Sequence, residues 1–344
     1  MVDFPNPVRY IGTTHVCIGG RMKRDQKLSR RGFVRSVISG AAVAGITRTL
    51  NPLEVIAGAV NTQAAMPTRP LGKTGYSACI FSLGGQATLE IDDRTDDALA
   101  IINRAIDLGV NYIDTAAAYG GGVSEQYLGR VMKTRRKEVF LASKTHDRSY
   151  DGSMRLLERS LNQLQTDHLD LWQLHNVRTQ DDLARIFAED GAIHALERAR
   201  EQGMVRFLGI TGHRDPFILK KGIVQYPFDT ILMALNAADK HNLSFIDNLL
   251  PVVVEKQMGI IGMKVPARGR IFREGGLSKM DQAMRYVLTL PVSTIIVGIS
   301  TVRELEENIQ IAREFKPYTK EEMADLEELT RPYYADASWF KERW

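Results

Sequence analysis

NYIDTAAAYG, residues 111–120, is the stretch that decides the fold of this 344-residue chain. An acid ends its apolar run, and a tyrosine follows five positions later. Two comparable stretches lie further along, FLASKT at 140–145 and DLWQLH at 170–175, and each joins an apolar run typical of a β-strand to a polar residue near its end. The carboxyl ends of parallel strands meet at one mouth of a closed barrel. We therefore expect four distant side chains to gather there: Asp114, Tyr119, Lys144 and His175.

The rest of the chain favours one large α/β domain. It is 44% apolar and 25% charged, and the (β/α)8 barrel is one of the few architectures that uses such a length as a single domain. Strand-like runs lie near 81–83, 112–113, 139–143, 169–174, 207–211, 230–235, 260–265 and 294–297, and stretches such as 92–108 and 153–164 have the one-sided apolar pattern of helices. A doubly wound open sheet would show the same alternation, but the GxGxxG motif expected after its first strand is missing. The sequence thus predicts a closed (β/α)8 TIM barrel.

The four side chains fit the chemistry of carbonyl reduction. A tyrosine hydroxyl can give a proton to a carbonyl oxygen, and a lysine ammonium beside it can lower the pKa of that hydroxyl. An aspartate can hold the lysine charged, and a histidine can orient the carbonyl. Taken singly, Asp114 could instead be a helix or turn cap, Tyr119 a packed aromatic and His175 a hydrogen-bonded core residue.

The motifs around these residues resemble those of the aldo-keto reductase family. The match runs through Gly109-Val110-Asn111-Tyr112-Ile113-Asp114-Thr115, Tyr119-Gly120, Ser124-Glu125 and Leu128-Gly129. The resemblance implies a barrel whose floor is plugged by a short hairpin, here 69–80, and whose C-terminal helix and tail fold over the mouth. It also implies that Asp114, Tyr119, Lys144 and His175 are the catalytic residues. His146, His168 and His194 lie outside the pattern and are interpreted as surface or packing residues.

The last strand supplies a cofactor signal. Val297-Gly298-Ile299-Ser300-Thr301 turns from a strand into a helix over 302–315, and the free N–H groups of a helix N-terminus can hold a phosphate. Glu307 and Asn308 match the family's pair on the adenine side. The resemblance implies NADP(H), with NAD as the other possibility, bound across the barrel mouth so that hydride reaches the carbonyl carbon while Tyr119 protonates the oxygen.

Several cofactor contacts depart from the family pattern. Thr211, Gly212 and His213 stand where many members have Ser-Asn, and Lys264 stands where an aromatic residue usually stacks on the nicotinamide. When the sixth strand is aligned on Asn236, Leu232 and Leu235 stand where the family commonly has Gln and Tyr. Glu304 stands where some members have Arg, which leaves the neighbouring Arg303 to meet a 2′-phosphate. The sequence leaves open whether these residues form a different grip on the cofactor or mark a loss of hydride transfer.

Residues 1–59 form a separate basic segment, with nine Lys and Arg against three Asp and Glu. Ser29-Arg30-Arg31-Gly32-Phe33-Val34 resembles the twin-arginine (Tat) export motif, and an apolar stretch at 37–46 follows it. Ala57-Gly58-Ala59 supplies a small-x-small cleavage site, with Ala65 as an alternative, and Met22 is the expected true start. We therefore expect an N-terminal extension with a signal peptide over 1–59 and the barrel domain over 60–344. A chance arginine pair in a basic arm is the alternative.

The leader predicts an exported, periplasmic protein that meets the Tat machinery. Its apolar stretch is about half of the roughly 20 residues that cross a bilayer, so no stable membrane anchor is expected. The balanced charge of the remaining chain gives no reason to expect nucleic-acid binding. The expected partner is a small carbonyl or alcohol substrate. Because the periplasm is not expected to supply free NADPH, an exported enzyme would load its nucleotide in the cytoplasm and retain it.

Two further features complete the sequence reading. Cys79 is the one cysteine after the leader, so it is interpreted as a small core residue, without a disulfide framework, a paired-cysteine metal site or an iron–sulfur motif. The C-terminal tail is rich in aromatic residues, namely Tyr333, Tyr334, Trp339, Phe340 and Trp344. We expect them either to form a wall of the substrate site or to dock on the side of the barrel. Two other functions stay open, a nucleotide-binding sensor barrel with little turnover and an ordinary cytoplasmic reductase.

Overall fold

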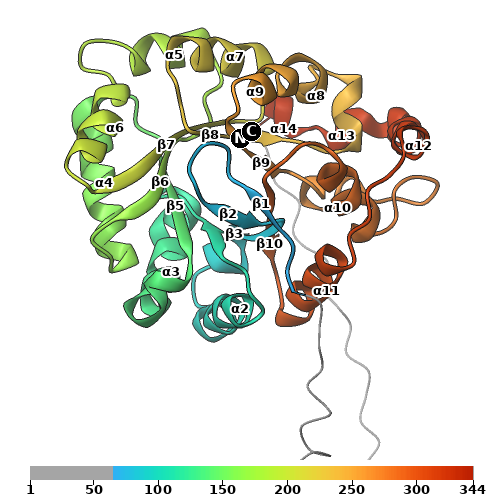
Figure 1. Cartoon of the computed structure of the whole chain (residues 1–344), viewed down its shortest axis with the longest axis horizontal. Coiled ribbons are helices and arrows are strands. Elements are labelled where there is room, and N and C mark those ends of the chain that lie inside the picture. Colours follow the sequence, from blue (N-terminus) through green and yellow to red (C-terminus); the bar gives the residue numbers. More distant parts are fainter. Residues whose placement is uncertain (1–64, 344) are drawn as a thin grey trace, which may run out of the picture. The chain divides into compact units, whose positions relative to one another are not determined.

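The computed structural model describes residues 65–343, which form a closed barrel of eight parallel strands surrounded by helices (Figure 1). The strands are neighbours in the order β10-β3-β4-β5-β6-β7-β8-β9. Their bounds are β3 Phe81–Ala87, β4 Tyr112–Asp114, β5 Phe140–Thr145, β6 Leu169–Leu174, β7 Val205–Gly212, β8 Thr230–Ala234, β9 Gly259–Met263 and β10 Thr294–Ile299. Every predicted strand run overlaps one of them. The predicted TIM barrel is therefore confirmed, and the open doubly wound sheet is excluded.

Helices follow the strands and cover the outside of the barrel. The longer ones are α2 Thr95–Asp107, α3 Val123–Arg135, α4 Tyr150–Leu164, α5 Gln180–Ile186, α6 Ala192–Glu201, α7 Pro216–Gln225, α10 Met280–Thr289, α11 Val302–Arg313 and α12 Lys320–Thr330. The shorter ones are α8 Phe245–Asn248, α9 Leu250–Glu255, α13 Tyr334–Ala337 and α14 Phe340–Arg343, with 3-10 turns η1 Thr88–Glu90, η2 Tyr119–Gly122, η3 Arg136–Glu138, η4 Ala237–His241, η5 Ala267–Gly269 and η6 Arg331–Tyr333. Side-chain caps fix several helix starts; for example, Ser149 accepts a hydrogen bond from the Gly152 N–H at the start of α4.

The strands read as continuous apolar runs because both of their faces are covered. All six residues of β5 and all six of β6 are buried. The β3 strand extends four residues beyond its apolar run, to Ala87, because its glycines let two backbones approach closely. A Cβ on Gly84 would lie 3.1 Å from the backbone of Val297 in β10. Hydrophobicity alone does not reveal this extension, because the added residues are Gly, Gln and Ala.

The hairpin that plugs the barrel floor is present as expected. Its strands β1 Thr68–Pro70 and β2 Ser77–Cys79 pair in antiparallel fashion and lie across one end of the barrel (Figure 1). Leu71 at its turn is fully buried in a cluster with Tyr112 of β4 and Phe140 of β5, whose rings stack at 5.4 Å. The opposite end of the barrel, which carries the carboxyl ends of the strands, is thus the open one. Cys79 is buried, as expected for a small core residue.

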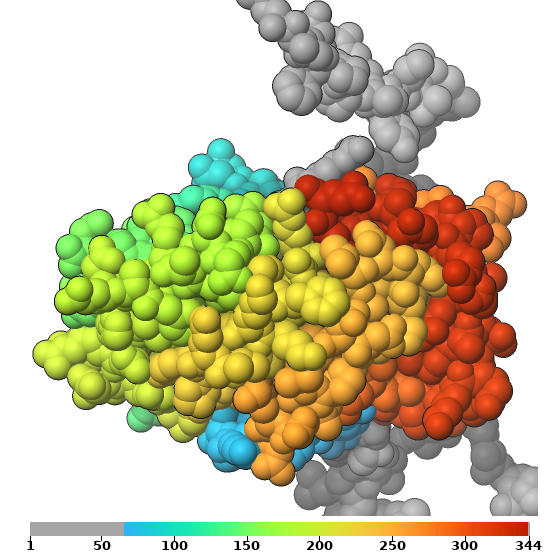
Figure 2. Space-filling view, turned by 90° about the horizontal axis from the view of Figure 1, so that it is seen from above, coloured from blue at the N-terminus to red at the C-terminus, as the bar shows by residue number. Residues whose placement is uncertain are grey.

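The C-terminal segment is anchored beside the open mouth. In Figure 2 this segment, in red, lies against the yellow and orange part of the chain that follows β8. The side chain of Phe340 is buried and meets the ring of His213 edge-on at 5.9 Å. The Lys341 ammonium, also buried, donates to the Asp239 carboxylate at 2.6 Å. The tail therefore docks on the barrel through Phe340 and Lys341, next to a mouth residue.

Some expectations fall outside the described residues. These are the signal peptide, its cleavage site, the start at Met22 and the aromatic Trp344. Within residues 65–343, no helix combines the length and the apolar composition needed to cross a membrane.

Candidate active site

Three strand ends and one loop bring the predicted catalytic residues together. Asp114 closes β4, Lys144 lies in β5, His175 directly follows β6, and Tyr119 opens the η2 turn after β4. The Lys144 ammonium donates to the Asp114 carboxylate, to the carbonyl of Thr115 at 2.7 Å and to the Tyr119 hydroxyl at 3.3 Å. The rings of Tyr119 and His175 meet edge-on at 5.6 Å. The structure therefore joins all four side chains in one cluster.

The centre of this cluster is a buried ion pair. Asp114 is 0% exposed and Lys144 is 1% exposed. The second carboxylate oxygen of Asp114 accepts a hydrogen bond from the Gln173 side-chain amide at 2.9 Å. Gln173 was not predicted as a site residue from the sequence. Its place as a polar residue inside the apolar run of β6 could have indicated a buried polar partner. With Gln173 and Thr115 as further partners, the pair has the hydrogen bonds that a buried charge requires.

Burial sets the protonation states of the cluster. Burial raises the pKa of Tyr119 above its ordinary value, and the nearby Lys144 only partly opposes this rise. Lys144 lowers the pKa of Tyr119, as the sequence predicts, but desolvation of the hydroxyl is the larger effect, so the net pKa of Tyr119 lies above its ordinary value. Burial by itself would lower the pKa of Lys144, but Asp114 and Tyr119 raise it. Burial, with Lys144 second, lowers the pKa of His175 well below its ordinary value. At neutral pH the cluster therefore holds a protonated phenol, an ammonium and a neutral imidazole.

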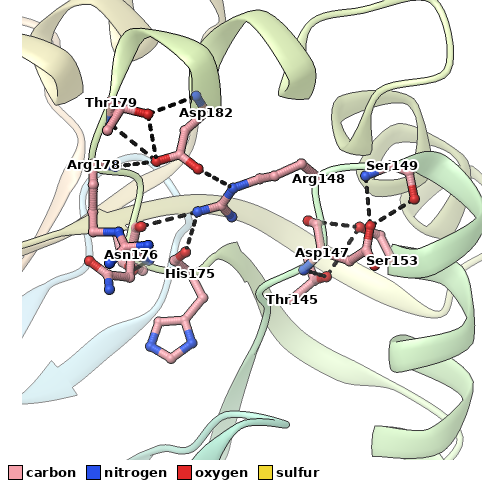
Figure 3. A network of polar contacts seen from close by, with 11 residues as sticks. Thr145, Asp147, Arg148, Ser149, Ser153, His175, Asn176, Arg178, Thr179 and Asp182 are labelled. Carbon is pink, nitrogen blue, oxygen red and sulfur yellow. Dashed lines mark hydrogen bonds and ion pairs between the residues drawn. The ribbon is translucent and has the colours of Figure 1, made fainter. Parts of the chain in front are cut away.

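A network on the loop after β6 fixes the position of His175 (Figure 3). Arg148 donates through Nη2 to the carbonyls of His175 and Asn176, at 2.9 and 3.0 Å, and through Nε to the Asp182 carboxylate at 2.9 Å. The backbone N–H of Asn176 donates to the Thr211 hydroxyl at 2.8 Å. Asn176 has a φ of 53°, a left-handed conformation that an asparagine tolerates. Arg148 and Thr211 thus hold the turn that presents the His175 ring.

Two neighbouring cavities open at this end of the barrel. The β10-side cavity, of about 510 Å³, runs from Tyr119 to Asn308, and the β6-side cavity, of about 490 Å³, runs from Tyr119 to Arg178. They share six lining residues: Gln86, Glu90, Tyr119, Met263, Lys264 and Arg268. Tyr119 therefore lies where a ligand in one cavity would meet a ligand in the other.

Seven of the ten predicted cofactor residues line these cavities. Lys264 borders both, and the others are Thr211 and His213 on the β6 side and Gly298, Ser300, Glu307 and Asn308 on the β10 side. The Nδ2 atom of Asn308 is buried and has no hydrogen-bond partner among the described residues. Burial lowers the pKa of Lys264 to about 7, and burial followed by the charge of Lys264 lowers the pKa of His213 to about 3.

The remaining three, Gly212, Asn236 and Arg303, do not line either cavity. A Cβ on Gly212 would meet the carbonyl of Val177 at 2.8 Å, so this position packs against the neighbouring loop. The Asn236 amide accepts from the Ala238 N–H at 3.0 Å and caps η4. The Arg303 side chain is 88% exposed and pairs with Glu307 at 2.8 Å. These three residues thus lie outside the walls of both cavities.

The N-terminus of α11 already carries an acid. The Glu304 carboxylate accepts a hydrogen bond from the Ser300 N–H at 2.7 Å, and the Glu304 N–H donates to the Thr301 hydroxyl at 3.1 Å. A carboxylate is favourable there because the helix dipole and the free N–H groups attract negative charge. A phosphate at this position would have to displace the Glu304 side chain. The expected phosphate site is therefore occupied by a residue of the chain itself.

Several lining residues were not found from the sequence. Arg148 and Arg178 were not singled out, and His146, interpreted as a surface or packing residue, is exposed but lines the β6-side cavity. His146 and Arg148 directly follow the Lys144 strand, and Arg178 lies three positions after His175. The signal was their place just beyond predicted strand ends, where barrel loops build the mouth.

Comparison with known proteins agrees with this geometry. The model of the aldo/keto reductase family matches residues 82–270, more than half of the chain. The chain belongs to the aldo/keto reductase family. The oxidoreductase YqkF of Bacillus subtilis is 27% identical over 305 residues, which cover 75% of this chain and 96% of that protein. L-galactose dehydrogenase of Arabidopsis thaliana is 26% identical over 309 residues, 77% of this chain and 94% of that protein.

A solved aldo-keto reductase from Bacillus halodurans has the same architecture. It superposes with a TM-score of 0.65 at 26% identity and covers 77% of this chain and 96% of its own. Each of these three relatives thus matches about three quarters of this chain and more than nine tenths of its own length. As a member of this family the protein is an oxidoreductase.

Proposed function

We propose that this aldo-keto reductase is an NADP(H)-dependent enzyme that interconverts a carbonyl group and an alcohol, with Asp114, Tyr119, Lys144 and His175 as its catalytic residues. The observation that carries the proposal is the position of the Tyr119 hydroxyl. Tyr119 borders both cavities, and its hydroxyl contacts the buried Lys144 ammonium at 3.3 Å. A substrate on the β6 side and a nucleotide on the β10 side would both reach it.

The protonation states support reduction of a carbonyl. NADP(H), when bound, supplies the hydride. Tyr119, held protonated by burial, donates its proton to the carbonyl oxygen as that oxygen gains negative charge. The neutral imidazole of His175 donates a hydrogen bond that orients the same oxygen. The Lys144 ammonium then stabilises the phenolate that Tyr119 becomes, and Asp114 keeps Lys144 charged. In the oxidative direction the same groups act in reverse.

The β10-side cavity fits a nicotinamide nucleotide at three points. The unpartnered Asn308 amide can donate to a base, and Lys264 and Arg268, which line the middle of the mouth, can attract phosphate groups. Glu307 lines the same end. Because Arg303 does not line the cavity and pairs with Glu307, preference for NADP over NAD would rest on Arg268 or Lys264, and NAD stays the alternative.

The proposal includes export by the Tat pathway, supported by the twin-arginine pattern at Ser29–Val34 and the basic character of residues 1–59. Translation would begin at Met22, and the precursor would leave the cytoplasm folded with its nucleotide retained. After cleavage of the signal peptide, the mature chain would begin near residue 60. Native mass spectrometry of protein from the periplasm tests both points. A processed chain with bound NADP(H) is expected. A chain absent from the periplasm would identify a cytoplasmic reductase, and nucleotide-free protein that is active with added NADPH would defeat the retention idea.

Replacing Tyr119 with Phe tests the reaction itself. General acid catalysis is typically worth 10²- to 10⁴-fold, so we expect kcat to fall by about that factor while nucleotide binding is kept. Tyr112→Phe is the matched control, because the buried Tyr112 hydroxyl has no partner among the described residues. An unchanged kcat in Tyr119→Phe would remove Tyr119 from the mechanism. Nucleotide binding without turnover in the unmodified protein would favour a sensor barrel.

A further inference from the structure

The β6-side cavity is strongly basic. Eight of its sixteen lining residues are Lys, Arg or His, and Glu90 is the one acidic residue among them. Glu90 lies on the side shared with the β10-side cavity, 3.5 Å from Arg268. The residues that line the β6-side cavity alone therefore include cations and no carboxylate.

Several of these basic groups are neutral, paired or shared with the β10-side cavity, and so are not available to bind a substrate anion. Lys144 is neutralised by Asp114, and burial lowers the pKa values of His175 and His213 so that both rings are neutral. Lys264 and Arg268 border the β10-side cavity as well and can serve a nucleotide phosphate. Two arginines, Arg148 and Arg178, line the β6-side cavity without lining the β10-side cavity, and so does His146.

Arg148 lines this cavity, and its guanidinium has fixed partners within the protein. Its Nε and Nη2 atoms are bound to Asp182 and to two backbone carbonyls, whereas its buried Nη1 has no partner among the described residues. Asp182 does not line the cavity, and its other oxygen accepts from the N–H groups of Arg178 and Thr179 (Figure 3). The Asp182 carboxylate, which pairs with Arg148, therefore does not line the β6-side cavity.

Arg178 adds a charge without a fixed counterion. Its side chain is exposed and makes no ion pair with any residue that the structure describes. A planar guanidinium at the edge of a cavity is suited to an oxyanion, which it can bind through two parallel hydrogen bonds. Arg148 and Arg178 lie on the same side of the cavity as the loop that carries His175.

We propose that the substrate is a carbonyl compound that also bears an oxyanion, a carboxylate or a phosphate, held by Arg178 and the field of Arg148 while Tyr119 and His175 engage the carbonyl oxygen. This substrate class rests on the proposed carbonyl reductase function. A cavity of about 490 Å³ accommodates a molecule of hexose size. An oxo acid, a uronic acid and a phosphorylated aldose all meet the requirement.

Matched substrates test the proposal. D-glucose, D-glucuronate and D-glucose 6-phosphate share one carbon skeleton, and butanal and 4-oxobutanoate form a smaller pair. We expect kcat/KM to be at least about tenfold higher for an anionic member than for its neutral partner, mainly through KM, as an added charge-assisted hydrogen bond would give. The preference should weaken between low and high salt, because part of the attraction is screened. The two sugar anions distinguish carboxylate from phosphate.

Variants then locate the anion site. Arg178→Gln should reduce the anionic preference, the ratio of kcat/KM between an anionic substrate and its neutral partner, about three- to tenfold, and Arg178→Glu should reverse it. Arg155→Gln is the control, because Arg155 is exposed on α4 and does not line the cavity. Since Arg178 has no side-chain partner among the described residues, these variants should fold normally.

The outcomes separate the substrate class from the function. Equal kcat/KM for neutral and anionic partners, or a preference untouched by Arg178→Glu, would overturn the proposal. If no carbonyl compound is turned over, the reductase function fails, and calorimetry with nucleotide-loaded protein still decides the anion site. Binding of D-glucuronate that is lost in Arg178→Glu would support it, and absence of binding by every anionic compound would overturn it.

Discussion

Removing the Lys144 ammonium should separate the structural role of the buried pair from its chemical role. In Lys144→Met, the Asp114 carboxylate, which is 0% exposed, keeps Gln173 as its side-chain partner and loses its counterion. Breaking a buried ion pair by removing one member typically costs about 3–5 kcal/mol of the free energy of unfolding. We expect a loss of that size at pH 7, reduced at lower pH as Asp114 takes up a proton.

The same substitution should slow catalysis for a different reason. Burial already raises the pKa of Tyr119, and Lys144 is the group that opposes this rise. Without the ammonium the phenolate is more costly, so proton transfer through Tyr119 should lose about 10²- to 10⁴-fold in kcat. The loss should be greater for alcohol oxidation, because Tyr119 must be deprotonated before it can accept the proton. The pH at which oxidation is fastest should also move upward.

The double variant Asp114→Asn with Lys144→Met is the control. It removes both charges and keeps similar side-chain volumes, so most of the lost unfolding free energy should return, because a neutral replacement of a buried pair is often close to neutral in stability. Its kcat should stay low, because Tyr119 still lacks the ammonium. Urea unfolding monitored by tryptophan fluorescence gives the stability, and steady-state kinetics in both directions gives the rates. A stable single variant, or a double variant with restored kcat, would refute the reasoning.

Two further predictions concern the C-terminal tail and the mouth. Lys341→Met should cost about 3–5 kcal/mol in urea unfolding, because Asp239 would lose its buried counterion, while kcat stays within a small factor since Lys341 does not touch the cluster. A kcat loss as large as that of Lys144→Met would contradict this. Burial lowers the pKa of His213 to about 3, below the ordinary value of about 6.5. Between these two pH values the unfolded chain binds a proton at this histidine and the folded chain does not. Stability should thus be full above about pH 6.5 and fall by up to about 1.4 kcal/mol per pH unit below it. His213→Gln should reduce this slope, to which His175 also contributes, and an unchanged slope would show that His213 does not contribute to it.

The sequence predicts the catalytic cluster well because each member lies next to a strand end. A barrel brings the ends of its strands together whatever their distance along the chain, so Asp114, Lys144 and His175 can be placed without any knowledge of side-chain packing. The loop between Asp114 and Tyr119 is short enough to keep the tyrosine at the same mouth. The roles of these residues remain a proposal, but their convergence is observed.

The contacts that depend on side-chain direction could not be predicted in the same way. Asn236 and Arg303 occupy plausible positions in the sequence, yet one caps η4 and the other turns outward to an ion pair one helical turn away. Arg148 was missed because its partners, the carbonyls of His175 and Asn176, lie 27 and 28 positions further along the chain. Glu304 was seen as a substituted arginine, and its bond to the Ser300 N–H depends on the local geometry of the α11 start.

Two buried lysine–aspartate pairs in this barrel show how chemistry can be told from architecture. Lys341 donates to Asp239 and to the carbonyls of Asn242 and Leu243, so every partner is an inert acceptor that holds the tail in place. Lys144 donates to Asp114 and one carbonyl in the same manner, but its third partner is the titratable Tyr119 hydroxyl, which borders both cavities. A buried pair is a weak source of stability, since apolar residues of equal volume often serve as well. The pair at Lys144 therefore calls for an explanation that the pair at Lys341 does not, and the contact of Lys144 with the titratable Tyr119 hydroxyl supplies it.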